Sequence, residues 1–189
     1  MANIQPELKR GAGILLPVSS LPSPYGIGTF GKAAYDFIDE LVRAGQSYWQ
    51  VLPVGPTSFG DSPYQSFSAF AGNPYFIDLD TLADDGLLDR DELNEIDWGS
   101  NADDVDYAKL YNNRYRILKK AYLAFLSSDD RKIKDRHGDF RQFREINSEW
   151  LNDYALFMAL KDRNNGKSWQ EWDDDIKFRK PEIVSYYKD

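Results

Sequence analysis

Two short apolar segments with a helical pattern between them constrain the fold of this chain most. Residues 11–17, Gly-Ala-Gly-Ile-Leu-Leu-Pro, form a continuous apolar run bounded by glycine and proline, which is typical of a fully buried parallel strand. Residues 48–52 have the same character, with aromatic and branched side chains before Pro53. Apolar residues between the runs recur at three- and four-residue spacing before a stop at Gly45: Ala34, Phe37, Ile38, Leu41 and Val42. The sequence therefore predicts two parallel strands joined by a helix.

Helical patterns dominate the chain after residue 77. They predict a short helix or a turn at residues 78–84 and helices at 89–95, 105–125 and from 140 or 147 to 163, with a charged connector at 129–138. Arg114 alone breaks the apolar stripe of the longest helix. This excursion of more than a hundred residues is too long for a crossover between strands, which normally takes about a dozen residues. We expect a helical subdomain inserted into an α/β barrel or sheet, at the start of a longer protein, because a complete eightfold barrel needs about 250 residues.

The net charge and the scarcity of histidine and cysteine limit the functions that this chain can have. The 189 residues carry a formal net charge of -8, with no cysteine and one histidine. The acidic charge argues against nucleic acid as a partner, and no apolar run reaches the roughly eighteen residues that predict a membrane span. Without cysteines or an N-terminal signal pattern, a cytoplasmic location is expected. His137 lies in a charged run that predicts a solvated loop. With one histidine and no cysteine, a zinc site with histidine or cysteine ligands is excluded, and a Ser-His-Asp triad is disfavoured.

Ligands of parallel α/β folds meet the carboxyl ends of the strands, so the two segments that follow the strands are the candidate binding loops. The first, residues 17–30, contains Pro22, Pro24, Gly26 and Gly28 and is predicted to be stiff. Its glycines match a phosphate-binding pattern only loosely. A turn that leads into the helix is the favoured interpretation.

The second loop, residues 53–74, is dense in turn-forming residues, hydroxyl groups and aromatic rings. Asp61, Ser62 and Tyr64 surround Pro63, which restricts Ser62 to an extended backbone. Asp-Ser-Pro is a common start of a turn, but for Ser62 and Tyr64 contact with a ligand is favoured. Three rings of this region are expected in the core: Phe67, Phe70 and Phe76. The loop predicts a neutral polar ligand with apolar faces, such as a sugar chain.

An evident pair of catalytic carboxylates is missing from these residues. Glycosyl transfer or hydrolysis typically uses two carboxyl groups about 5 to 9.5 Å apart. Neither predicted strand ends in Asp or Glu, and the acidic clusters at 84–85, 103–104 and 173–175 lie in patterns typical of solvent-facing surface. We therefore expect no catalytic residue, no metal ligand and no cofactor site in this chain.

Several longer segments are more specific than any short motif. They are residues 13–17, 19–28, 48–53, 55–57, 60–74, 105–107 and 153–160, and the fifth reads Gly-Asp-Ser-Pro-Tyr-Gln-Ser-Phe-Ser-Ala-Phe-Ala-Gly-Asn-Pro. Over these segments the sequence resembles the amylomaltase family, the 4-α-glucanotransferases that disproportionate α-1,4-glucans.

This resemblance implies the N-terminal portion of a (β/α)8 TIM barrel with a large, mainly helical inserted subdomain. Residues 1–60 would form the first two β/α units of the catalytic barrel, and residues 61–189 the substrate-cleft loop and the inserted subdomain. The resemblance also implies a retaining mechanism with a covalent glycosyl-enzyme intermediate and no organic cofactor. The reactive carboxylates of the family would lie on later strands beyond Asp189, so this chain alone is expected to be inactive.

The resemblance also implies roles for individual residues. Ser62 and Tyr64 fall where the family contacts glucan near the cleavage point, with Tyr64 stacking on a glucose ring, and Asp61 belongs to the same substrate-binding set. Phe59 and Tyr111 match a second, outlying glucan groove of some members. Phe59 stands where those members have a tyrosine, so a stacking face remains and a hydroxyl hydrogen bond is lost.

The expected partners are neutral α-1,4-glucans, such as maltodextrins and starch, with neither nucleic acid nor membrane, and a monomer is favoured. Two other functions stay open at this point: a noncatalytic α-glucan-binding module and an α-amylase-type hydrolase on the same barrel.

Overall fold

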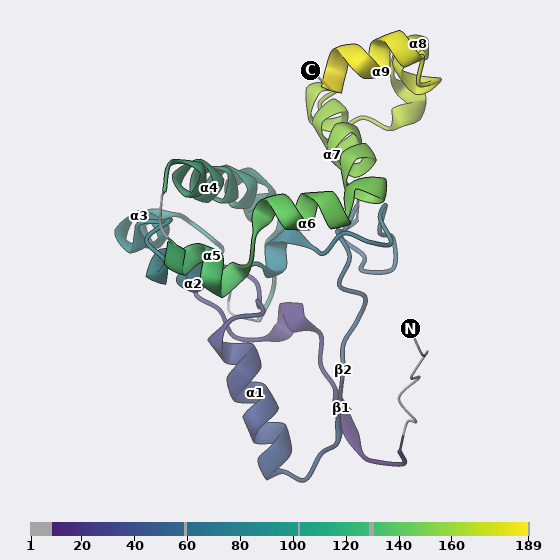
Figure 1. Ribbon diagram of the computed structural model, residues 1–189. Helices are drawn as coiled ribbons and strands as arrows, with labels where there is room; N and C mark the ends of the chain where they lie inside the picture. The colour runs from purple at the N-terminus through teal and green to yellow at the C-terminus, as the bar shows by residue number, and fades with distance from the viewer. Residues whose placement is uncertain (1–8, 59, 102, 129–130, 189) are drawn as a thin grey trace. The chain divides into compact units, whose positions relative to one another are not determined.

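The computed structural model describes residues 9–58, 60–101, 103–128 and 131–188. The chain divides into two compact units, Met1–Asp129 and Asp130–Asp189. In the first unit, strands β1 (Gly13–Leu15) and β2 (Tyr48–Gln50) pair in parallel, with Gly13 opposite Tyr48 and Leu15 opposite Gln50. The predicted strand–helix–strand order is confirmed, and Figure 1 shows helix α1 (Lys32–Arg43) running beside the two strands.

The prediction that the first strand is fully buried is wrong for the structure described. Every residue of β1 is exposed, including Ile14 at 42% and Leu15 at 54%. A parallel strand is buried when helices cover both faces of a larger sheet. Within the described residues the sheet has two strands and α1 lies on one side, so apolar strand surface stays uncovered.

Helix α1 packs its inner face against the strands and ends where predicted. Ala34 and Leu41 are buried, whereas Ile38 and Val42, which the same spacing placed on the apolar face, are exposed. A small core forms where α1, the strand ends and the first loop meet; it contains Val18, Leu21 and Ala34, with Leu16, Ala33, Phe37, Trp49 and Phe76 packed against them. Gly45 follows the helix with φ +68°, a backbone that glycine adopts without strain.

The remaining helices of this unit are α2 (Leu79–Asp84), α3 (Arg90–Glu95) and α4 (Tyr107–Ser127), and Figure 1 shows them beyond the carboxyl ends of the strands. Helices α3 and α4 were predicted, and α2 forms where a short helix or a turn was expected. Each begins after an aspartate whose side chain accepts a backbone N–H of the first turn: Asp78, Asp89 and Asp106. Two 3₁₀ turns, Val18–Ser20 and Pro74–Phe76, lie in the loops that follow β1 and β2.

The buried face of α4 corrects the prediction that Arg114 breaks an apolar stripe. Leu110, Arg114, Ile117 and Ala121 are the buried residues, and Arg114 is fully inaccessible. Tyr111, which the spacing placed on the same stripe, is 63% exposed. The guanidinium is buried because two backbone carbonyl groups outside the helix accept its hydrogen bonds, as described below.

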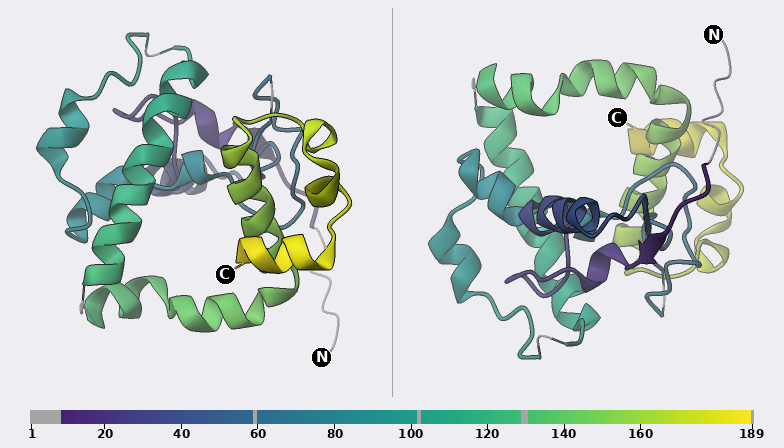
Figure 2. Two further views of the ribbon diagram at one scale, coloured as in Figure 1. Left: turned by 90° about the horizontal axis from the view of Figure 1, so that it is seen from above. Right: turned by 90° about the horizontal axis from the view of Figure 1, so that it is seen from below.

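The second unit consists of helices and short turns. They are α5 (Arg131–His137), α6 (Phe140–Ile146), α7 (Ser148–Arg163), the 3₁₀ turn Trp169–Glu171, α8 (Asp174–Lys177) and α9 (Pro181–Lys188). The predicted helix from residue 140 or 147 is two helices divided at Asn147. Figures 1 and 2 show α9 lying across the end of α7, and the Arg163 guanidinium lies 5.2 Å from the Tyr187 ring centre.

The charged connector predicted at residues 129–138 is mostly helix, because α5 occupies residues 131–137. His137 is therefore the last residue of a helix and is exposed, not part of a solvated loop. The run has little apolar periodicity, but lysine and arginine have high intrinsic helix propensity, which the pattern could not show. Across the described part of the chain, no helix combines the length and the apolar character needed to cross a membrane.

Candidate functional site: a hollow at the carboxyl ends of two parallel strands

The segments that follow β1 and β2 meet around a hollow of about 80 Å³. The first segment contributes Pro17, Val18 and Ser19, the second Leu52, Pro53, Thr57, Asp61, Pro63, Asn73 and Phe76, and α4 contributes Tyr107. A volume of this size holds a few water molecules, so within the described residues the hollow is the floor of a site and not a complete pocket. Its position is the one at which parallel α/β folds bind ligands.

A backbone hydrogen bond closes the first loop, residues 17–30. The Gly28 N–H donates to the Ser19 carbonyl at 3.1 Å, which closes the loop behind the hollow. A Cβ at position 28 would lie 2.0 Å from the Val18 carbonyl oxygen, so only glycine fits this close approach. The glycines of this loop therefore serve a tight turn into α1, as predicted.

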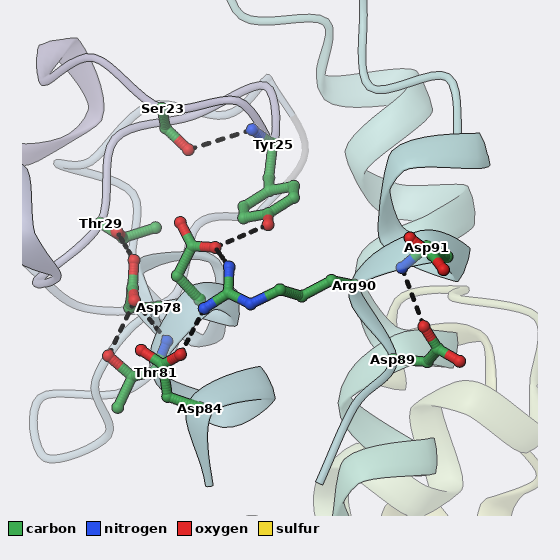
Figure 3. Close-up of polar contacts among 10 residues, drawn as sticks. Ser23, Tyr25, Thr29, Asp78, Thr81, Asp84, Asp89, Arg90 and Asp91 are labelled. Carbon is green, nitrogen blue, oxygen red and sulfur yellow. Dashed lines mark hydrogen bonds and ion pairs between the residues drawn. The ribbon is translucent and has the colours of Figure 1, made fainter. Parts of the chain in front are cut away.

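Two side chains tie the first loop to the start of α2, as Figure 3 shows. Thr29 Oγ1 donates to Asp78 Oδ2 at 2.6 Å, and the Tyr25 hydroxyl donates to Asp80 Oδ1 at 2.8 Å. Burial, reinforced by the hydrogen bond to Asp80, raises the pKa of Tyr25 to about 12. Tyr25 therefore stays a neutral donor at physiological pH.

Asp78 combines a loop anchor and a helix cap. Its Oδ1 accepts from both the N–H and the hydroxyl of Thr81 at 2.8 Å, while Oδ2 accepts from Thr29. Burial raises the pKa of the Asp78 carboxyl, but the hydrogen bonds from Thr29 and Thr81 together outweigh burial, and the net shift is downward. Asp78 is therefore held as a carboxylate.

Arg90 extends the same network on the surface, where it bridges Asp80 at 2.5 Å and Asp84 (Figure 3). Both ion pairs are open to solvent, with 49% of the Arg90 side chain exposed. Because exposed pairs of this kind contribute little to stability, the anchoring of the first loop depends on Asp78 and Tyr25.

The second loop, residues 53–74, is held at its base and by its own turns. At the base, the Asn73 N–H donates to the Val54 carbonyl at 2.8 Å, and the Asn73 side chain accepts from the Tyr75 N–H at 2.9 Å. Further out, the Asp61 N–H donates to the Ser58 carbonyl at 3.0 Å. Asp61 has φ +54°, a left-handed backbone that aspartate and asparagine tolerate better than most residues. The position of the Asp61 carboxylate therefore depends on a strained backbone conformation.

Of the residues expected to bind substrate, Asp61 lines the hollow. Burial raises the pKa of its carboxyl group. Ser62 is half-buried, and its hydroxyl lies 3.4 Å from the Tyr64 N–H, within a turn that the Gln65 N–H closes on the Ser62 carbonyl at 3.1 Å. Tyr64 is 73% exposed. Ser62 and Tyr64 do not line the hollow, but they flank Pro63, which does.

Of the two residues expected in an outlying groove, the structure describes one, Tyr111. Tyr111 is exposed on α4, and its ring meets that of Tyr115 edge to face at 6.3 Å. Phe59 lies outside the described residues. Among the rings expected in the core, Phe76 packs against the core but Phe70 is 72% exposed, because it follows Ser68 in a turn at the surface.

Sequence reasoning missed Asn73 and Tyr107 as parts of this site. Asn73 is nearly inaccessible and caps the 3₁₀ turn at Pro74–Phe76, and Tyr107 is the first residue of α4. The Asn-Pro pair was a usable signal for a capped turn. Nothing local could have placed Tyr107, because its position depends on how α4 packs.

The acidic clusters take no part in this hollow. Asp84, Asp103, Asp104 and the run at 173–175 are exposed, as predicted, whereas Asp85 is half-buried. A second hollow, of about 130 Å³, lies within the other unit between α7, α8 and α9, and its lining is mostly apolar. Although it is larger, we place the candidate site at the smaller one, because polar groups and strand ends converge there. No group of three or more histidine, aspartate or glutamate side chains that could hold a metal ion occurs among the residues described.

Comparison with known proteins defines the class to which this fold and this hollow belong. The model of a family described as 4-alpha-glucanotransferase matches residues 16–189. The chain therefore belongs to the 4-α-glucanotransferase family.

Individual relatives agree with this assignment. The chain is 54% identical over 172 residues to a 4-alpha-glucanotransferase of Clostridium butyricum, covering 91% of this chain and 34% of that protein. It is 48% identical over 166 residues to the 4-alpha-glucanotransferase of Thermus thermophilus, covering 88% of this chain and 32% of that protein.

A solved structure is also similar. The amylomaltase of Streptococcus agalactiae in complex with acarbose superimposes with a TM-score of 0.86 at 43% identity, covering 95% of this chain and 35% of that one. The chain thus spans about a third of the length of the relatives it matches.

Proposed function

We propose that the complete protein is a 4-α-glucanotransferase that transfers α-1,4-glucan segments between maltodextrins, and that this chain supplies walls of its substrate cleft. The observation that carries the proposal is the family match across residues 16–189 together with a hollow at the carboxyl ends of β1 and β2. The activity belongs to the proposal because the chain spans about a third of its relatives.

The parallel pair supports a barrel as the architecture of the complete protein. In this proposal β1 and β2 are the first two strands of a (β/α)8 barrel, residues 1–60 are its first two β/α units, and residues 61–189 are the cleft loop and the inserted helical subdomain. Exposed Ile14 and Leu15 support it, because further strands and helices would cover apolar strand faces of this kind.

The substrate-binding roles rest on the chemistry of the second loop. Asp61 offers a carboxylate as acceptor for sugar hydroxyl groups in the hollow, and Ser62 adds a hydroxyl beside it. The exposed Tyr64 ring offers an apolar face on which a glucose ring can stack. Phe59 and Tyr111 keep their proposed role in an outlying groove for longer glucans.

The chemistry of transfer is assigned to residues outside this chain. A retaining mechanism needs two carboxyl groups about 5 to 5.5 Å apart, one as nucleophile and one as acid and base. Among the described residues that line the hollow, Asp61 alone carries a carboxyl group. We therefore propose that this chain binds and orients glucan and contributes no reactive group.

Incubation of the complete protein with maltotriose tests the proposed reaction. Transfer yields glucose together with maltodextrins longer than the substrate, whereas hydrolysis yields only shorter products. Shortening without elongation would replace the transferase with the amylase-type hydrolase. Binding of acarbose without any change in maltotriose would favour the noncatalytic α-glucan-binding module.

The setting of the enzyme is part of the same proposal. Neutral maltodextrins or starch are its partners, the protein acts as a monomer, and it is located in the cytoplasm, as the cysteine-free sequence led us to expect. Cell fractionation and the mass of the purified protein in solution check these two points.

A further inference from the structure

A buried arginine stands behind the wall of the hollow. Arg114, in the middle of α4, has no accessible surface. Its Nη2 donates to the Tyr75 carbonyl at 2.8 Å and also to the Ile77 carbonyl. One guanidinium nitrogen therefore joins α4 to the carbonyl groups of Tyr75 and Ile77, in the segment of residues 73–78 that follows the second loop.

Keeping a guanidinium in this place costs free energy, because a charge leaves water. Burial lowers the pKa of Arg114 to about 10, although the nearby Asp78 carboxylate acts in the opposite direction. The Trp98 ring lies 6.0 Å from the guanidinium carbon and compensates the charge weakly. Nε and Nη1 are buried and have no hydrogen-bond partner among the described residues. An apolar side chain would avoid the cost of the buried charge but would leave the Tyr75 and Ile77 carbonyl groups without this donor, so the role that the arginine has here is to hold these two carbonyl groups.

The segment that Arg114 holds is the place where both loops of the hollow come together. Asn73 and Phe76, at either end of the 3₁₀ turn, line the hollow. The Phe76 carbonyl accepts the Phe30 N–H of the first loop at 3.0 Å, and Asp78, the residue after Ile77, accepts from Thr29. Displacement of this one segment would therefore move both loops.

The same helix also reaches the hollow directly. Tyr107, on the first turn of α4, lines it, and Arg114 follows seven positions later, about two helical turns away. A hydrogen bond from Arg114 to the segment thus fixes the loops relative to a helix that forms another wall of the same hollow. We propose that Arg114 is a positioning residue of the glucan cleft, which sets the two loops against α4 without touching the substrate. This proposal rests on the proposed function in one respect, namely that the hollow belongs to the cleft.

Two substitutions in the complete protein test the proposal. Arg114→Met keeps an unbranched apolar stem, is shorter than arginine and removes every donor, whereas Arg114→Lys keeps a cation with donors but loses the planar fork. The matched control is Arg116→Met, because Arg116 lies on the same helix, is exposed and forms a long, 3.8 Å ion pair with Glu92. All variants are measured at a temperature at which near-ultraviolet circular dichroism shows them folded.

The first readout does not depend on activity. In Arg114→Met, we expect faster hydrogen exchange in peptides that contain the Phe30 and Asn73 amides, relative to Arg116→Met at equal global stability, because the segment that anchors both loops is released. The second readout is kinetic. We expect kcat/KM for maltotriose to fall roughly ten- to a hundredfold in Arg114→Met, with an intermediate loss in Arg114→Lys and none in Arg116→Met.

The outcomes separate three possibilities. A lower melting temperature for Arg114→Met with unchanged local exchange and unchanged kcat/KM would overturn the proposal and leave Arg114 a purely structural residue. Absence of transfer in the unmodified protein would refute the proposed function, while the exchange comparison would still decide whether Arg114 holds the loops. Should Arg114→Met fail to fold, Arg114→Lys decides: a wild-type kcat/KM in that variant contradicts the proposal.

Discussion

The two loops that enclose the hollow are built in opposite ways. In the first, Val18, Leu21 and Ile27 are buried. The side chains of Tyr25 and Thr29 donate hydrogen bonds to Asp80 and Asp78, about fifty positions away, and so anchor the loop. In the second, Tyr64 and Phe70 are exposed, and the hydrogen bonds of the Ser62, Ser66 and Ser68 side chains span two or three residues, as in the bond from Ser66 Oγ to the Ser68 carbonyl at 2.8 Å. Long-range contacts make a scaffold of the first loop, whereas local turns leave the second loop's side chains available to a ligand.

The largest expected effect comes from disrupting the anchor of the first loop. Asp78→Ala removes the acceptor for Thr29, the cap of α2 and a charge near Arg114, so we expect a loss of about 3 kcal/mol in the free energy of unfolding. Urea unfolding of the complete protein measures it. Asp84→Ala is the control, because Asp84 is exposed and bonds to Arg90 on the surface. Equal losses in the two variants would show that the Asp78 network does not anchor the loop.

The next effect tests the ligand-facing side. Tyr64→Ala removes a ring that is 73% exposed, so the melting temperature should stay near that of the unmodified protein. The free energy of glucan binding should weaken by about 1 to 3 kcal/mol, because an aromatic ring that stacks on the sugar is lost. Kinetics with maltotriose and calorimetric titration with acarbose measure this loss. Tyr64→Phe keeps the ring and should retain most of the affinity; the same defect in both variants would assign the role to the hydroxyl group instead.

The contrast between the loops also explains how much of the fold the sequence could predict. Helices α1 and α4 were predicted because their spacing is a local property, and the hollow lies where a site was expected, because parallel strands present their carboxyl ends together. Arg114 was interpreted as a break in a stripe, because its acceptors, the Tyr75 and Ile77 carbonyls, lie 39 and 37 positions away. Long-range hydrogen bonds of this kind leave no periodic signal.

Burial was hardest to predict where it depends on distant chain. Ile14 and Leu15 have the sequence of a covered strand, yet within the described residues they are 42% and 54% exposed. The opposite error occurred at Phe70, where a large ring suggested a core position and the turn after Ser68 exposes it. Within the candidate site, Asp61 was expected to bind substrate together with Ser62 and Tyr64, and it alone of the three lines the hollow, whereas Tyr107 enters the lining through the packing of α4.

The smallest effect concerns Asp61, whose partly buried carboxylate lowers the stability of the folded state. Burial raises its folded pKa above the ordinary value of 3.8, so the folded state binds more protons than the unfolded state in the window between these two values. The free energy of unfolding should therefore fall as pH rises through that window. Asp61→Asn removes the titration and keeps a residue suited to φ +54°, so above the window the variant should be as stable as the unmodified protein or more stable.

The same substitution should weaken glucan handling, because the amide is a poorer acceptor for sugar hydroxyl groups than a carboxylate. Urea unfolding at several pH values and maltotriose kinetics on the two proteins separate these effects. A variant that loses stability at neutral pH would mean that the Asp61 charge is compensated in the fold. A variant that gains stability while losing activity would show that the second loop carries a destabilised carboxylate for binding, which is the property that distinguishes it from the anchored first loop.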